Sequence, residues 1–236
     1  MVKYLKKELN EYKILLNDMP SLVLCLFTLS VVCMNLLANK ELFTTEYLAL
    51  DCGFTLSWIS FLCMDIICKR YGPRAANRIS FLVLVINLLI CTAVKLLSMT
   101  PGKWGEYYSA SDVVIADAIN NSLNVTIGGT WYIVLGSSLA MFVAALTNSS
   151  LNWFIGKTFS EDSYKHFAVR SFVSTTAAQF VDNLVFATVI SKVFFGWTWT
   201  QVIVCSITGA VFELLWEVIF SPLGYRITKK WKENGF

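Results

Sequence analysis

Ionisable and amide side chains interrupt the long apolar runs of this sequence, and they are the residues that could do chemistry. In the run 169–195, Asp182 stands three residues after Gln179, so helical spacing places the two side chains on one stripe, and Asn183 adjoins it. An ionisable side chain at bilayer depth costs roughly 2.5 to 3.5 kcal/mol, so it needs a partner, a water-filled cavity or a ligand. We therefore interpret Asp182, beside Gln179, as a functional residue.

Two further pairs of charged residues have the spacing of one helix face. Glu213 and Glu217 are four residues apart in the run 200–223. Asp65 and Lys69 are also four residues apart, with Asp65 in the run 52–68 and Lys69 directly after it. A structural salt bridge near the inner membrane interface and a role in transport fit these four residues equally well. Amides in two other runs are most simply explained by hydrogen bonds between packed helices. These amides are Asn35, Asn39, Asn148 and Asn152.

Carboxylates and amides in this setting suit a small, flat, polar solute, because they supply both acceptors and donors. Nearby aromatic residues could flank a ring, namely Phe54, Trp58, Phe180 and Phe186. The single histidine, His166, and seven cysteines without a CxxC pair argue against a metal site, a disulfide framework and a His-dependent nucleophile. No phosphate-binding glycine loop or repeated channel filter occurs either. We therefore expect no cofactor, no metal and no enzymatic activity.

Composition identifies the solvent of this chain as lipid. Of 236 residues, 56% are apolar and only 15% are charged, against about 25% charged in an ordinary soluble domain. The mean hydropathy is +0.60, so the apolar residues cannot all lie inside one water-solvated core. A net charge of +3 is too small to suggest nucleic-acid binding.

The apolar runs predict an all-α integral membrane protein with six transmembrane helices. A short amphipathic N-terminal segment (1–20) precedes the transport domain (21–223), and a basic tail (224–236) follows it. The six predicted spans are Ser21 to Asn39, Cys52 to Cys68, Ile79 to Met99, Trp131 to Ile155, Val169 to Phe195, and Thr200 to Leu223. Between the third and fourth spans, the stretch SDVVIADAINNSL predicts a short amphipathic helix lying at the outer surface.

Lysine and arginine are distributed asymmetrically between the predicted loops. Fifteen of the nineteen lie in the segments 1–20, 69–78, 156–170 and 224–236, which an even number of spans places on one side. By the positive-inside rule, both termini are expected in the cytoplasm. The apolar faces of the spans could contact lipid or a second copy of the chain equally well, so the sequence is compatible with a homodimer.

With these residues located, the sequence resembles the queuosine precursor transporter family, also called the YhhQ or VUT (vitamin uptake transporter-like) family. The resemblance covers most of the chain, and its most specific stretch is the fifth span, with Arg, Ser-Thr, Gln, Asp and Phe at the family's positions. The matching segments are NLLANK (35–40), Asp51 with Gly53, MDIICKRYG (64–72) with Arg74 and Arg78, RSFVSTTAAQFVDNLVF (170–186) and EVIFSPLGY (217–225).

The resemblance implies uptake of deazaguanine precursors of queuosine, or of the queuine base, across the cytoplasmic (inner) membrane by a secondary carrier. It implies that Asp182 and Gln179 read the edge of the base. Further roles follow for residues of other spans: Asn35 and Asn39 close over the substrate, Asp65 and Glu217 serve a cationic substituent or a coupling proton, and Arg170 is an inner anchor.

The sequence departs from the family pattern at two positions. The family has Glu where Lys69 stands and Lys where Glu213 stands, so both charges are inverted here. Inverting both charges would preserve an ion pair that inverting one would destroy. We therefore predict that Lys69 and Glu213 form a structural ion pair between the second and sixth spans.

Three other functions remain compatible with the sequence. A vitamin-binding membrane subunit that needs a separate ATPase module would have a similar six-helix plan. An intramembrane aspartyl enzyme would have to use Asp65 with Asp182, because no histidine lies in any span. A purely structural membrane protein would leave the carboxylates inside the spans unexplained.

Overall fold

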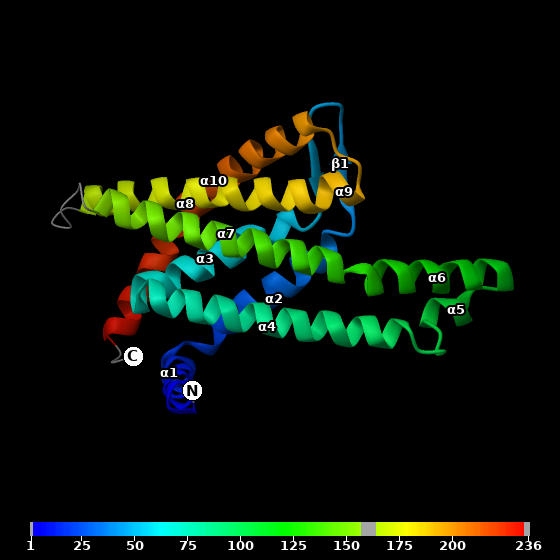
Figure 1. The fold of residues 1–236 in the computed structure, drawn as a ribbon, viewed down its shortest axis with the longest axis horizontal. Coiled ribbons are helices and arrows are strands. Elements are labelled where there is room, and N and C mark those ends of the chain that lie inside the picture. The colour runs from blue at the N-terminus through cyan, green and yellow to red at the C-terminus, as the bar shows by residue number, and fades with distance from the viewer. Residues whose placement is uncertain (1, 157–163, 234–236) are drawn as a thin grey trace.

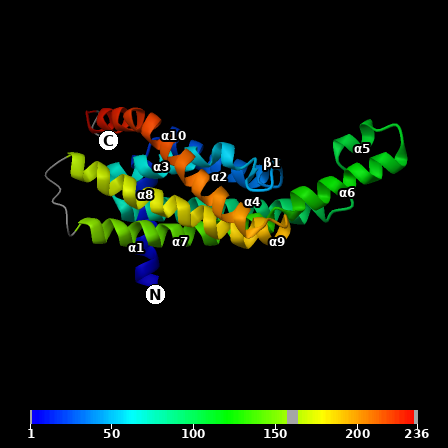
Figure 2. The same cartoon turned by 90° about the horizontal axis from the view of Figure 1, so that it is seen from above.

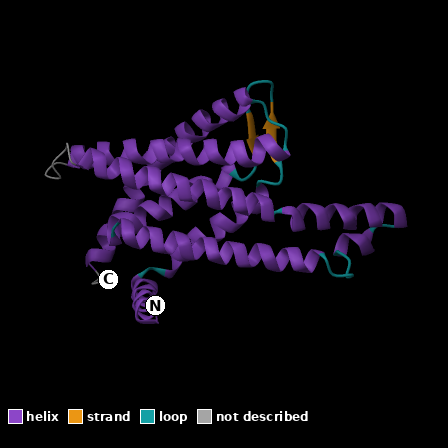
Figure 3. Ribbon diagram, in the orientation of Figure 1, coloured by secondary structure: helices purple, strands orange, loops and turns teal. Residues whose placement is uncertain are grey.

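The computed structural model describes residues 2–156 and 164–233, and helices make up nearly all of it (Figure 3). The helices are α1 (Val2–Asp18), α2 (Ser21–Leu37), α3 (Phe54–Tyr71), α4 (Pro73–Ser98), α5 (Gly105–Ser109), α6 (Val113–Gly129), α7 (Trp131–Gly156), α8 (Tyr164–Phe186), α9 (Lys192–Phe194) and α10 (Trp199–Glu233). Two strands, β1 (Glu41–Thr44) and β2 (Ala49–Asp51), and one π-helix, η1 (Ala187–Ser191), complete the described elements.

Long helices occupy the positions of the six predicted spans. These helices, α2, α3, α4, α7, α8 and α10, run back and forth along the bundle (Figure 1). As a result, α1 and the C-terminal part of α10 lie toward one end, which we call the basic end because the Lys- and Arg-rich segments 2–20, 69–78 and 224–233 gather there (Figures 1 and 2). The strands and the α5–α6 pair lie toward the opposite end, which we call the hairpin end.

Four of the described helical stretches are long and apolar enough to cross a bilayer, namely Pro73–Ser98, Val113–Asn148, Phe172–Phe194 and Trp199–Trp216. The helices α1 and α2 meet this criterion only together, and they are bent by 109° at their junction. The apolar part of α3, Phe54–Cys68, is shorter. The chain is therefore a multi-pass membrane protein with four or five spans by length and composition, and six spans stay a prediction.

The sharp reversal between α3 and α4 has a local cause. Gly72 has a φ of +86°, a left-handed conformation that a side chain would disfavour, and its N–H donates to the Cys68 carbonyl at 2.8 Å. Pro73 follows as the first residue of α4, where its missing N–H costs nothing. This Gly-Pro pair ends one helix and starts the next within a single residue.

The tightest apolar packing joins α2, α3 and α4. Phe27 and Val31 of α2, Ile67 of α3, and Ile79 and Val83 of α4 are all fully buried. Their spacing of four residues within α2 and within α4 puts each pair on one face of its helix. This cluster fixes the three helices that form one side of the bundle.

A two-stranded hairpin is the one described element that departs from the all-α prediction. The antiparallel strands pair Phe43 with Leu50 and Thr44 with Ala49, and a bulge lies between Glu41 and Phe43. Ala49 is fully buried and packs with Trp197 and Val202 beside the start of α10. The hairpin is therefore part of the packed structure rather than a solvated loop.

The helix α8 changes its geometry where it approaches the hairpin end. A continuous span to Phe195 was expected, but η1 replaces the α-helix over Ala187–Ser191, and Gly196, with a φ of +72°, then turns the chain. A π-helical turn inserts one residue into the helical repeat, so it rotates the side chains that follow it. Such turns occur often at functional sites.

The helix α6 begins with a side-chain cap, because the Asp112 carboxylate accepts the N–H groups of Val114 at 2.7 Å and Ile115 at 3.3 Å. A helix is therefore present where the sequence predicts one. However, α6 continues the direction of α7 and projects with α5 beyond the bundle (Figures 1 and 2), rather than crossing its end. Its packing along the C-terminal part of α4, with Gly128 against Ser98, accounts for this direction.

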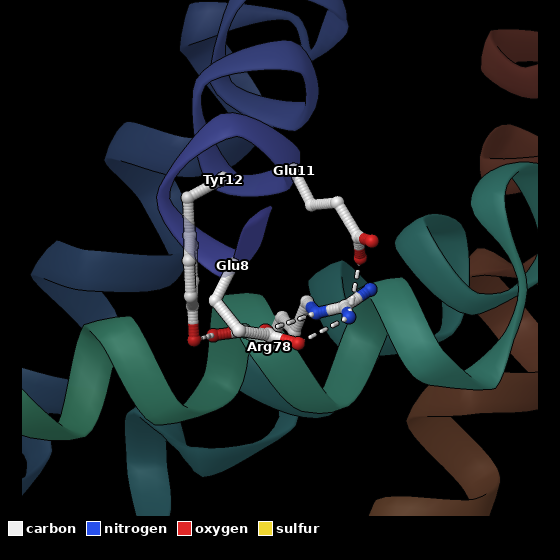
Figure 4. Close-up of polar contacts among 4 residues, drawn as sticks. All are labelled: Glu8, Glu11, Tyr12 and Arg78. Atoms are coloured by element: carbon white, nitrogen blue, oxygen red, sulfur yellow. Dashed lines mark hydrogen bonds and ion pairs between the residues drawn. The ribbon is translucent and has the colours of Figure 1, made fainter. Parts of the chain in front are cut away.

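The helix α1 lies across the bundle and is tied to α4 by one arginine (Figure 4). Arg78 donates from Nε and Nη2 to the two carboxylate oxygens of Glu8, both at 3.2 Å, and also pairs with Glu11. The Tyr12 hydroxyl donates to the Arg78 carbonyl at 3.2 Å. Burial and the Glu8 charge raise the pKa of this hydroxyl, although Arg78 lowers it, so Tyr12 stays a donor at neutral pH.

We expect Arg78→Gln to loosen α1 without unfolding the bundle. The ion pairs are partly exposed, so amide exchange in α1 should become about two- to fivefold faster, as measured by hydrogen–deuterium exchange. Lys6→Gln, an exposed change on the same helix, is the control. Equal exchange of α1 in the Arg78→Gln variant and the unaltered protein would show that other contacts hold this helix.

Candidate functional site

A cavity of about 680 Å³ lies inside the helix bundle. Residues from α2, α3, α4, α7, α8, η1 and α10 line it, so every long helix of the bundle contributes to its wall. Pockets for small molecules in proteins span roughly 300 to 1,000 Å³. The bundle therefore encloses a space of the size that a small organic ligand requires.

The exposed residues of the cavity wall lie between the first half of α4 and the second half of α7, and we take this place as the mouth of the cavity. The lining residues that are exposed gather there: Phe81 is 62% exposed, Phe142 61% and Leu146 54%. Arg74 and Asn77, which are exposed and lie near the start of α4, add polar groups to this mouth. A solute could reach the interior through this mouth.

The hairpin end of the cavity is closed by buried residues and direct hydrogen bonds. Trp197 is 3% exposed, lines the cavity and donates from its indole Nε1 to Glu41 Oε1 at 2.7 Å. Gln201 donates from Nε2 to the Thr45 carbonyl at 2.7 Å. These two bonds join the hairpin to the turn that leads into α10, and we call them the hairpin clamp. The clamp covers the hairpin end of the cavity.

A buried carboxyl group from α10 lies at the centre of the polar wall. Glu213 is 3% exposed and lines the cavity. Ser57 of α3 lies 2.8 Å from Glu213 Oε1 through its Oγ, and Asn183 of α8 donates from Nδ2 to Oε2 at 3.2 Å. Three helices therefore meet at one carboxyl group through uncharged partners.

Asp182 of α8 also lines the cavity, one residue before Asn183. Among the side chains that the structure describes, none forms a hydrogen bond or ion pair with its carboxyl group. A carboxyl group that faces a cavity without a protein partner is available to a ligand, and keeping it there is otherwise costly. Asp182 is thus the most direct candidate for a binding residue.

Other polar atoms at the cavity wall are also left without a partner among the described side chains. They are Ser80 Oγ of α4, Ser191 Oγ of η1 and Asn148 Oδ1 of α7. Ser191 is fully buried and Ser80 is 8% exposed, so neither hydroxyl is compensated by bulk solvent. The three atoms are themselves buried, so none of them touches the open space of the cavity in this structure.

The residues predicted as the site are distributed unevenly around the cavity. Asn35, Asp182, Asn183 and Glu213 line it. Gln179 is fully buried outside the cavity wall, and both of its amide atoms lack a partner among the described groups. Gln179 and Asp182 therefore have different surroundings, because closely packed helices enclose Gln179 whereas Asp182 faces the cavity.

Asn39 lies at the hairpin end of α2 and makes a structural contact instead of facing the cavity. Its Nδ2 donates to Thr130 Oγ1 at 2.8 Å, at the junction of α6 and α7. The predicted roles of four further residues concern side chains outside the described set. These residues are Asp65, Lys69, Arg170 and Glu217. The predicted ion pair of Lys69 with Glu213 stays a prediction for this reason.

The aromatic residues expected to flank a ring are also divided. Phe54 and Phe186 line the cavity, and Phe54 packs edge-to-face against Phe212 with ring centroids 6.0 Å apart. Trp58 instead stacks on Trp216 at 5.3 Å. Two aromatic walls thus face the cavity, one from α3 and one from the end of α8.

Asp51 places another acid at the hairpin end of the cavity. Burial raises its pKa to about 6, although the Phe54 N–H, which donates to Asp51 Oδ1 at 3.2 Å, lowers it. Among the described residues, no three His, Cys, Asp or Glu side chains come together as a metal site would require. The acids around the cavity are therefore candidates for binding protons or organic ligands.

The fold and the cavity together define a class: an α-helical, multi-pass membrane protein whose bundle encloses a polar ligand-sized space. The chain belongs to the family described as "Putative vitamin uptake transporter", whose sequence model matches residues 51–227. This match confirms the predicted family resemblance, and it indicates a transporter rather than an enzyme. No curated protein and no solved structure matches the chain.

Proposed function

We propose that this protein imports a small planar heterocycle, a deazaguanine precursor of queuosine or the queuine base, across the cytoplasmic membrane as a secondary carrier. The observation that carries the proposal is the Asp182 carboxyl group at the wall of the 680 Å³ cavity, which has no partner among the described side chains. The edge of a guanine-like base presents adjacent N–H donors, and a carboxylate can accept two of them side by side. No other described group at the wall is so clearly available.

The rest of the cavity supports a flat, polar substrate. Phe54 and Phe186 offer ring faces against which a heterocycle can stack. The mixed apolar and polar wall is typical of sites that bind small organic molecules.

The orientation of the proposed carrier follows from charge. Because the basic end carries most of the lysines and arginines, we place it, with both termini, in the cytoplasm. The mouth of the cavity at that end then serves substrate release. A carrier must also open its other side, so import requires the hairpin clamp to part.

Uptake by the chain alone tests the proposal against the ATPase-dependent alternative. Purified protein in proteoliposomes should accumulate a labelled deazaguanine base, and unlabelled base should compete better than common vitamins. Tight binding of the base without transport would instead favour a subunit that needs a separate ATPase module. Failure to bind any of these compounds would refute the proposed substrate class.

A close helix contact beside the site gives a further prediction. A Cβ atom at Gly209 of α10 would lie 2.8 Å from Asn183 Nδ2 and 3.0 Å from Asn183 Cγ. We expect Gly209→Ala to displace the Asn183 amide from Glu213, because neither backbone can retreat without loss of packing. Uptake of the base should fall about tenfold, which corresponds to roughly 1.4 kcal/mol.

Gly105→Ala is the matched control, because a Cβ atom there meets nothing within 4 Å. Both variants should be compared in uptake assays at equal membrane expression. Normal uptake by a well-expressed Gly209→Ala protein would show that the position of Asn183 is not important for transport.

A further inference from the structure

The carboxyl group of Glu213 lies in a hydrogen-bond network that can gain or lose a proton with no change other than the rotation of one hydroxyl group. Ser57 Oγ lies 3.1 Å from the Phe54 carbonyl and 2.8 Å from Glu213 Oε1, but a hydroxyl has only one proton to donate. When Glu213 is protonated on Oε1, it donates to Ser57, and Ser57 donates to Phe54. When Glu213 is ionised, the Ser57 hydroxyl rotates and donates to Oε1.

Asn183 stabilises the group in both states, because its Nδ2 donates to the other oxygen, Oε2, at 3.2 Å. Both carboxyl oxygens of Glu213 thus keep a partner whether the proton is present or absent. A single hydroxyl rotation separates the two states. This is the arrangement that reversible proton binding requires in a place from which bulk water is largely excluded.

The charged neighbours of Glu213 make its proton depend on the contents of the cavity. The described titratable groups that face it are Asp182 from α8 and Cys205 on α10 itself, and ionisation would make each of them negative; Asp51 of β2 lies beyond, next to Cys205. The facing residue on α3 is Ser57, and η1 contributes no titratable group. The side chains of Asp65, Lys69 and Glu217 lie outside the described set.

Two carboxylates that share a poorly hydrated space repel each other, so ionisation of Asp182 favours the protonated form of Glu213. A neutral substrate that binds the Asp182 carboxylate displaces water from the cavity and strengthens this repulsion. Substrate binding and proton binding therefore favour each other, and by linkage this coupling is reciprocal.

We infer that Glu213 is the proton-binding site of the carrier, and that one proton bound there accompanies each neutral heterocycle bound at Asp182. This inference rests on the proposed transport function. The substrate is then released at the basic end. Loss of the Glu213 proton to the cytoplasm restores the repulsion between the Glu213 and Asp182 carboxylates, and this weakens substrate binding. The proton moves between Glu213 Oε1 and water, and no covalent bond of the substrate changes.

The experiment uses the full chain in proteoliposomes that contain a fluorescent pH indicator. Adding a deazaguanine base outside should acidify the interior, and an inward gradient of one pH unit should raise the accumulation ratio up to about tenfold. In Glu213→Gln the amide can donate to Ser57 permanently. The pH gradient should therefore leave the accumulation ratio of this variant unchanged, whatever its rate of uptake. The exposed change Glu106→Gln should behave as the unaltered protein does.

Equilibrium binding gives a second readout that does not depend on transport by the variant. The Kd of the unaltered protein for the base should rise with pH as Glu213 loses its proton, whereas the Kd of Glu213→Gln should not rise with pH, because only the ionisation of Asp182 remains and that strengthens binding. Base uptake without internal acidification, or a proton response that survives in Glu213→Gln, overturns the inference and leaves the carrier function standing. Absence of base binding to the unaltered protein instead overturns the proposed function, and the inference fails with it.

Discussion

Replacing Asp182 by asparagine is expected to lower uptake of a deazaguanine base about a hundredfold. The substitution keeps the size of the side chain but removes the charge and turns one acceptor oxygen into a donor. Two charge-assisted hydrogen bonds to the base, each contributing roughly 1.5 kcal/mol, would be lost or weakened. A total of about 3 kcal/mol corresponds to a change in affinity of this size.

The fold should tolerate this substitution, because the Asp182 carboxyl group makes no described hydrogen bond that its loss would break. Labelled uptake into cells and binding to purified protein are the two measurements. Asp117→Asn is the matched control, since Asp117 pairs with Lys103 at 3.1 Å on the projecting α5–α6 region, away from the cavity. Asp182→Asn protein with normal uptake and binding would remove this residue from the site.

Cross-linking the hairpin to the start of α10 is expected to stop transport reversibly. Gln201 Nε2 and the Thr45 carbonyl are 2.7 Å apart, so cysteines at these two positions lie within reach of a short bifunctional thiol reagent. If the substrate enters past the hairpin, fixing these residues together keeps the cavity closed on that side. Uptake should fall below about a tenth and return when a reducing agent releases the link.

The chain has seven cysteines of its own, among which Cys25 is exposed, so the reagent must also be tested on the unaltered protein and on each single variant. Binding of the base from the cytoplasmic side should survive in the cross-linked protein, because the mouth between α4 and α7 is untouched. Full transport by the cross-linked double variant would place the entrance elsewhere.

Much of the fold could be predicted from apolar run lengths. The helices α2 and α7 begin and end close to the predicted runs, and α4 ends close to its run although it begins six residues earlier, because a bilayer imposes a nearly fixed apolar length. The hairpin could not be predicted, since its strands are three and four residues long and take their stability from packing against α10. The π-helix was equally hidden, because nothing in the composition of Ala187–Ser191 distinguishes it from an α-helical turn.

The site was predictable where a charge lies in an apolar run, and much less so elsewhere. Asp182 and Glu213 stand out for the cost of placing a carboxyl group in lipid. Ser57 and Ser191 do not stand out, because serine is common in membrane helices and only the arrangement of neighbours shows which hydroxyl reaches a carboxyl group and which lies buried at the cavity wall. Gln179 shows the opposite limit, since helical periodicity gives the face of a helix but does not reveal that its neighbours bury Gln179 away from the cavity wall.

The most direct test of this account is equilibrium binding of a labelled deazaguanine base to the purified full chain, with the Asp182→Asn protein measured alongside it. The account predicts saturable binding of one base per chain to the unaltered protein, competition by unlabelled base but not by common vitamins, and about a hundredfold weaker binding to Asp182→Asn. Equal binding by both proteins, or no saturable binding by the unaltered one, would contradict it.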